Sequence, residues 1–114
     1  MLTVKTHNNS DIDANMTHLQ GYLTMEKHAL VALFGAPLDH SYDNDKVINE
    51  WTLEITDENG DSGVVTIYDW KNYGMGSLGD NYRNWNVGGH KQAALTVLEE
   101  LLGQTSRPFK VSIR

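Results

Sequence analysis

The spacing of apolar residues predicts a helix over residues 25–34. Apolar side chains recur there at helical intervals, Gly35 follows as the left-handed residue that ends a helix, and Pro37 prevents continuation. Thr24 stands where the N-cap of this helix belongs. We therefore expect one defined helix in the N-terminal half of the chain.

A wider apolar face predicts a second helix that follows a strand ending at Val87. This helix carries His90 and Lys91 in its first turn and ends at Gly103. Strands are predicted where apolar and polar residues alternate. These segments are 19–23, 48–56, 64–70, 85–87 and 109–113.

Residues 48–56 and 64–70 are predicted to form a hairpin, and the length of its loop decides which side chains share a face. A two-residue loop at Asn59-Gly60 would split the apolar residues between both faces. A three-residue loop, with Gly60 in the left-handed region, gathers five large apolar side chains on one face and is favoured by burial. These side chains are Trp51, Leu53, Ile55, Val65 and Ile67.

The reverse face of this hairpin is predicted to be polar enough for water and aromatic enough for a partner. It carries Thr52, Glu54, Thr56, Thr66, Tyr68 and Trp70. Tyr68 and Trp70 are the candidate partner-binding residues of this face.

Together these elements predict an α+β fold, in which an antiparallel sheet of four to five strands packs two helices on one face. The order is strand, helix, hairpin, strand, helix, strand. Residues 1–16 show little periodicity and are expected to form a partly ordered segment or a short edge strand, followed by a single domain over 17–114. The terminal strand and the aromatic hairpin face both offer association surfaces, so we expect a homo-oligomer.

Composition narrows the classes of function. The 114 residues contain no cysteine, which removes disulfides and thiolate chemistry, and the net charge of -6 argues against binding extended nucleic acid. No apolar run is long enough for a membrane span, and the first residues lack the core of a secretion signal. The expected location is therefore the cytoplasm.

Residues 82–91 form the local cluster that most favours a ligand-binding site. A strand end, two glycines and a basic helix start would direct free amides, the positive end of a helix and basic side chains at one spot, which suits an anion such as phosphate. Aromatic rings nearby would stack on a planar group, and asparagines would bind its edge. The candidate ligand-binding residues are Tyr82, Arg83, Trp85, Asn86, Gly88, Gly89, His90 and Lys91. The structural alternative is that Gly88 and Gly89 only allow a tight turn from strand to helix.

Other chemistries find less support in the sequence. The five histidines form no pair at metal-ligand spacing, and the polar loop Asp39–Asp45 has the composition of a solvated turn. A two-carboxylate hydrolase would have to be built from Glu50, Glu54 or Asp69, and nothing in the sequence favours any pair. We therefore expect no catalytic residues, no metal and no cofactor.

Five sequence blocks resemble a family of small, largely uncharacterised phage-encoded proteins. They occur in the family's order and cover residues 17 to 102, although Asn86 stands where a histidine is expected. The blocks are Thr17–Tyr22, Leu33–Pro37, Glu50–Ile55, Val65–Lys71 and Trp85–His90.

The resemblance implies a viral accessory protein that counters a bacterial defence inside the host cell. One mechanism is sequestration, without catalysis, of a nucleotide-derived signal such as a cyclic nucleotide. The alternative is a protein-binding inhibitor of a host defence effector, and a small hydrolase is the third class. Small anionic ligands and host proteins are thus the partners expected from the sequence.

Overall fold

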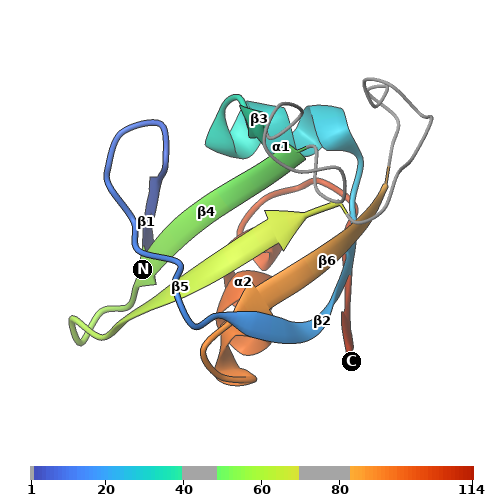
Figure 1. Ribbon diagram of the computed structural model, residues 1–114. Coiled ribbons are helices and arrows are strands. Elements are labelled where there is room, and N and C mark those ends of the chain that lie inside the picture. Colours follow the sequence, from blue (N-terminus) through green and yellow to red (C-terminus); the bar gives the residue numbers. More distant parts are fainter. Residues whose placement is uncertain (1, 40–48, 70–82) are drawn as a thin grey trace.

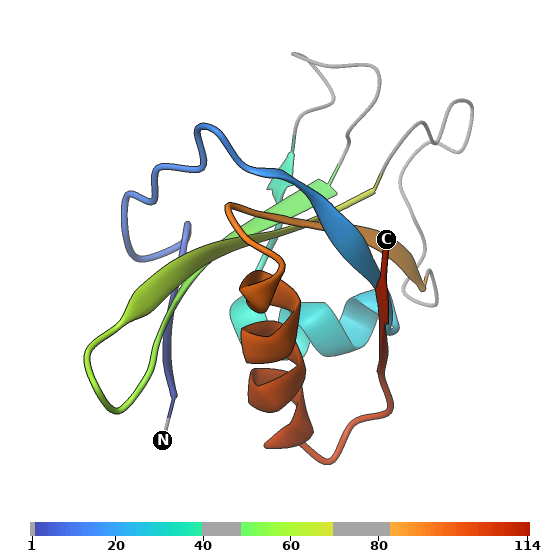
Figure 2. The same ribbon diagram turned by 90° about the horizontal axis from the view of Figure 1, so that it is seen from below.

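The fold is a curved antiparallel sheet with two helices against one face (Figures 1 and 2). In this computed structural model, residues 2–39, 49–69 and 83–114 are described. The elements are β1 (Thr3–Thr6), β2 (His18–Thr24), α1 (Lys27–Phe34), β3 (Leu38–Asp39), β4 (Asn49–Thr56), β5 (Ser62–Tyr68), β6 (Asn84–Gly89), α2 (Ala93–Gly103) and β7 (Lys110–Ile113).

The sheet confirms the α+β prediction and is larger than the four to five strands expected. Its strand order is β1-β4-β5-β6-β2-β7. The short β3 pairs with the other end of β4, on the same edge as β1. The extra strands are β1, which arises from the edge segment near the N-terminus, and the two-residue β3. We call the side that carries α1 and α2 the helix face and the opposite side the outer face (Figure 2).

The predicted hairpin register is confirmed. Trp51 lies opposite Ile67, and the Asp57 amide donates to the Asp61 carbonyl at 2.9 Å, which leaves a three-residue loop. Gly60 in this loop has φ 87°, as the left-handed position requires. All five apolar side chains that were predicted to share a face are at most 1% exposed, and they form the floor of the core under the helices.

Helix α1 begins later than predicted because the sheet extends past its expected N-cap. Thr24 is the last residue of β2, and the Met25 amide donates to the Arg83 carbonyl at 3.1 Å, which continues the pairing of β2 with β6. The helix then runs from Lys27, with Glu26 at the N-cap position. Its predicted end is confirmed, since Gly35 is the C-cap residue with φ 85°.

The reverse face of the hairpin is less open than predicted. Thr52 and Thr66 are each 4% exposed, because residues 7–17 cross the outer face on their way from β1 to β2 (Figure 1). His7 anchors this crossing: its amide donates to the Thr52 carbonyl at 3.1 Å, and its Nδ1 accepts from the Thr52 amide at 3.3 Å. These hydrogen bonds join the segment before β2 to strand β4 of the hairpin.

Two hairpin glycines offer a matched test of the loop geometry. A Cβ added at Gly60 or at Gly63 would meet no atom within 4 Å, but only Gly60 has a positive φ. We expect Gly60→Ala to lower the free energy of unfolding by about 1 kcal/mol through backbone strain alone. Gly63→Ala should leave stability unchanged or raise it by up to about 1 kcal/mol. Urea unfolding of both variants measures the difference, and equal stabilities would contradict the assigned loop.

Candidate functional site

The cradle predicted around Gly88 and Gly89 is not assembled. Both glycines lie in β6, where Gly88 pairs with Thr66 and Gly89 with Val65 on one side, while β2 pairs with them on the other. Glycine is needed at both positions because neighbouring side chains come close to the backbone, and not because the chain turns there. A Cβ at Gly88 would come within 2.4 Å of the Thr66 hydroxyl, and one at Gly89 would come within 2.6 Å of the Ala94 side chain.

His90 and Lys91 lie in the link between β6 and α2 rather than in the first helical turn. The helix begins at Ala93, so the two basic residues precede it. The His90 imidazole is held by the segment that crosses the outer face, since its Nε2 lies 2.9 Å from the Asn15 carbonyl oxygen. Both residues are exposed, and the two glycines whose amides the sequence had suggested belong to the paired strand β6.

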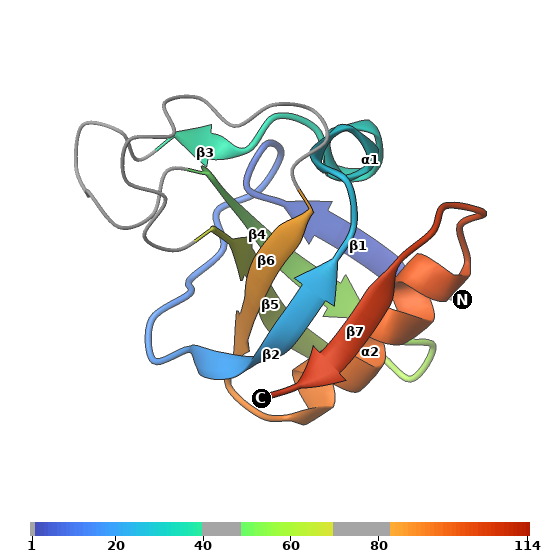
Figure 3. The ribbon, with the colours of Figure 1, turned by 90° about the vertical axis from the view of Figure 1, so that its right-hand side faces the viewer.

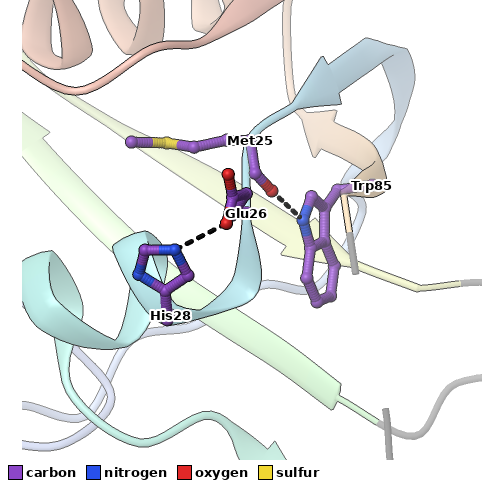
Figure 4. Close-up of polar contacts among 4 residues, drawn as sticks. All are labelled: Met25, Glu26, His28 and Trp85. Atoms are coloured by element: carbon purple, nitrogen blue, oxygen red, sulfur yellow. Dashed lines mark hydrogen bonds and ion pairs between the residues drawn. The ribbon is translucent and has the colours of Figure 1, made fainter. Parts of the chain in front are cut away.

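Trp85 belongs to the core and is unable to stack on a ligand. Its side chain is 1% exposed, and its indole Nε1 donates to the Met25 carbonyl at 2.8 Å (Figure 4). The ring also meets Trp51 edge to face at a centroid distance of 5.2 Å. Arg83 is exposed, and its carbonyl accepts the Met25 amide. Tyr82 and Trp70 lie outside the described residues.

One cavity does contain the two predicted basic residues. It has a volume of about 230 Å³ and lies between the hairpin loop and the start of α2. Its floor is apolar and includes Ile55 and Val65, and its rim carries His90 and Lys91 together with Asp57 and Asp61. Two carboxylates in the same rim oppose the attraction of the basic groups for an anion.

The outer face gathers a different set of polar and aromatic side chains. Asn86 in β6 lies between Tyr68 in β5 and Tyr22 in β2, because each pairs with it directly. Glu50 extends this row beyond Tyr68, and Ser112 extends it beyond Tyr22. Neighbouring side chains in such a row stand about 5 Å apart at Cβ. We call Tyr22, Asn86 and Tyr68 the tyrosine row.

Two members of the tyrosine row, Asn86 and Tyr68, were candidates from the sequence, and Tyr22 was not. Tyr22 is 43% exposed, while Tyr68 and Asn86 are half-buried. Alternation with the buried Leu23 is the sequence signal that could have placed Tyr22 on the outer face. Its position beside Asn86 depends on the pairing of β2 with β6, which are far apart in the sequence.

A cavity of about 300 Å³ opens beside the tyrosine row under the crossing segment. Tyr68, Thr66, Glu50 and Gly88 line its sheet side. Residues of the crossing segment and the start of β2 line the other side, namely Ala14, Thr17 and His18. Gly88 contributes no side chain to this cavity, and the half-buried ring of Tyr68 lies beside it.

The environment of Tyr68 favours its neutral form. Burial raises the pKa of the Tyr68 phenol above its ordinary value, and the charges of Glu50 and Tyr22 raise it further. The Glu50 carboxylate accepts from the Thr52 hydroxyl at 3.1 Å, which fixes one of its oxygens near the cavity. The phenol is therefore a hydrogen-bond donor at neutral pH.

The carboxylates considered for hydrolysis do not converge. Glu50 and Glu54 are four residues apart on β4, a spacing of about 13 Å along a strand. Asp69 is buried, and its Oδ2 accepts from the amide and the side chain of Asn49 at 3.0 and 3.1 Å. Among the described residues no three histidine or acidic side chains group to hold a metal. Residues 40–45 of the Asp39–Asp45 loop lie outside the described ranges.

Comparisons with known proteins give no family for this chain: no family model, curated protein or solved structure matches it. Neither helix in the described ranges is long and apolar enough to cross a membrane.

The raised pKa of Tyr68 provides a test that Glu50 and Tyr22 lie close to Tyr68 on the outer face. Because the folded pKa lies above the unfolded value, this phenol contributes stability that is complete below pH 10 and is lost as the pH rises through the folded pKa. We expect Glu50→Gln and Tyr22→Phe each to lower the pKa of Tyr68, since each removes a negative charge. NMR titration of the tyrosine ring carbons, assigned with Tyr68→Phe, measures it. Glu54→Gln on the same strand is the control, and an equal effect there would contradict the assignment.

Proposed function

We propose that this chain is a non-catalytic binding protein that recognises a protein partner through the tyrosine row of its outer face. The supporting observation is the exposure of Tyr22 beside Asn86 and Tyr68 on strands that the core holds rigid. A side chain on a paired strand loses little conformational freedom on binding, because the backbone is already ordered.

The chemistry of the row suits a protein surface. Tyrosine is enriched at the centres of interfaces because its ring buries a large area and its hydroxyl keeps a hydrogen bond. Asn86 adds an amide with donors and acceptors, and the adjoining cavity of about 300 Å³ has room for a partner side chain. The net charge of -6 favours a basic partner at the encounter stage.

The biological role that we propose follows from the resemblance to small phage-encoded proteins. A protein of this class would act by covering a surface of a bacterial defence effector. Recognition through the outer face requires no reaction at the site, which agrees with the separation of Glu50 from Glu54 along β4.

Binding of a small anion is a second candidate function. It is favoured by the cavity of about 230 Å³ whose rim contains His90 and Lys91. It has less support than protein binding, because Gly88 and Gly89 use their positions for sheet packing and Asp57 and Asp61 share the rim. A nucleotide-derived signal would be the ligand in this case.

Partner capture tests the first proposal. The tagged chain is incubated with lysate of a susceptible bacterium, and bound proteins are quantified by mass spectrometry. We expect one host protein to be enriched, and Tyr22→Ala to weaken its binding by at least about thirty-fold, the effect of losing a central aromatic anchor. Val31→Ala is the matched control, because Val31 is 38% exposed and lies on α1 at the other side of the sheet. Recovery of the bait alone, or equal losses in both variants, would contradict the proposal.

A thermal-shift panel of cyclic and linear nucleotides tests the second. If the cavity near α2 binds a nucleotide, at least one compound raises the melting temperature, and Lys91→Ala abolishes the rise. Asp61→Asn is expected to increase the shift, since it removes an opposing charge from the rim. A flat panel rejects nucleotide binding and leaves the protein-binding proposal untouched.

A further inference from the structure

We propose that strand β7 binds an extended acidic segment of a partner, which adds to the sheet as a further antiparallel strand. The site is the margin of the sheet formed by residues 110–114, and it is separate from the tyrosine row. The inference therefore stands or falls independently of the proposed function, although both surfaces meet at Ser112 beside Tyr22.

The backbone of β7 is open on one side. Within the described part of the chain, β7 pairs only with β2, and Figure 3 shows it at the margin of the sheet. The Arg114 amide donates to the Gln20 carbonyl at 3.1 Å. This bond determines which residues of β7 direct their backbone groups toward β2. Because bonded and non-bonded pairs alternate in an antiparallel ladder, Ser112 and Lys110 also face β2.

The remaining positions then direct their backbone groups outward. The amides and carbonyls of Val111 and Ile113 point away from β2, and no described residue provides a partner for them. Ile113 is 68% exposed, which is unusual for a large apolar side chain next to free backbone groups. These are the donors and acceptors that strand addition uses.

The side chains of β7 specify the chemistry of the added strand. Lys110 and Arg114 are exposed on the outer-face side with Ser112 between them, and Val111 and Ile113 point to the helix side. With Arg107, these are three of the nine basic residues in the chain, and no acidic residue occurs between 107 and 114. An alternating segment of the form Glu-Val-Thr-Val-Glu would place carboxylates beside the two cations and apolar side chains beside Val111 and Ile113.

A second copy of this chain fits the edge less well. Antiparallel pairing of two β7 strands over all of residues 110–114 would place Lys110 opposite Arg114 of the second copy at both ends. Like charges directly opposite each other destabilise a strand pair. The charge pattern of β7 thus favours an acidic partner over self-association.

A charge swap tests the specificity of the edge. The probe is a fluorescent peptide with the core Glu-Val-Thr-Val-Glu, and the comparison peptide has Lys-Val-Thr-Val-Lys. By fluorescence anisotropy at low salt we expect the acidic peptide to bind the intact chain at least tenfold more tightly than the basic one. The double variant Lys110→Glu with Arg114→Glu should reverse this order. No binding of the acidic peptide, or an order that the double variant leaves unchanged, would overturn the proposal.

A proline substitution tests the outward hydrogen bonds. Ile113→Pro removes an amide that points away from β2, so it should abolish peptide binding while the melting temperature stays within a few degrees of wild type. Ile113→Ala retains the amide and is the matched control, which should keep most of the binding. Equal binding by both variants would show that the edge backbone is not used. If the free chain sediments as a dimer that Ile113→Pro dissociates, the occupant is a second copy and the proposal is wrong.

Discussion

Two tryptophan indoles fix helix α1 against the sheet, on the face opposite the tyrosine row. Trp85 donates to the Met25 carbonyl at 2.8 Å, just before the helix, and Trp51 donates to the Gly35 carbonyl at 2.9 Å, just after it. The two rings meet edge to face at 5.2 Å. Leaving one such buried polar group without its partner costs about 1–3 kcal/mol. The helix is thus held at both ends by strands β4 and β6.

This arrangement assigns Trp85 to the core, and it leaves the outer face as the surface through which we propose recognition. Tyr22, Asn86 and Tyr68 lie on the outer face, and both described helices, α1 and α2, lie on the opposite face of the sheet. The crossing segment, residues 7–17, covers only part of that face and leaves a cavity beside the row. The edge strand β7 adjoins the row at Ser112, and the backbone groups of Val111 and Ile113 in that strand have no partner among the described residues.

The parts of the fold that depend on neighbouring residues could be predicted from the sequence. The hairpin register follows from the two-residue alternation around Trp51 and from one glycine in the left-handed region, Gly60. The end of α1 follows from Gly35 in the same way. In both cases a local pattern decides the structure.

The candidate site could be predicted only in part, because distant segments decide it. Gly88 and Gly89 have the same letters as a strand-to-helix turn, but what requires glycine there is the side chain of Thr66 on one face and of Ala94 on the other. The tyrosine row exists because β2 pairs with β6 across the sheet. The local sequence around Tyr22 does not indicate that β2 pairs with β6.

Hydrogen exchange of the tryptophan indoles measures whether both rings anchor helix α1 to the sheet. The indole N–H resonances of Trp51 and Trp85, assigned with Trp→Phe variants, are followed by NMR after transfer to deuterated water. We expect both to exchange far more slowly than a free indole, because both are buried and bonded to the carbonyls that flank α1. Rapid exchange at Trp85 would contradict the anchoring of α1 by this ring and would favour a role of Trp85 in ligand binding.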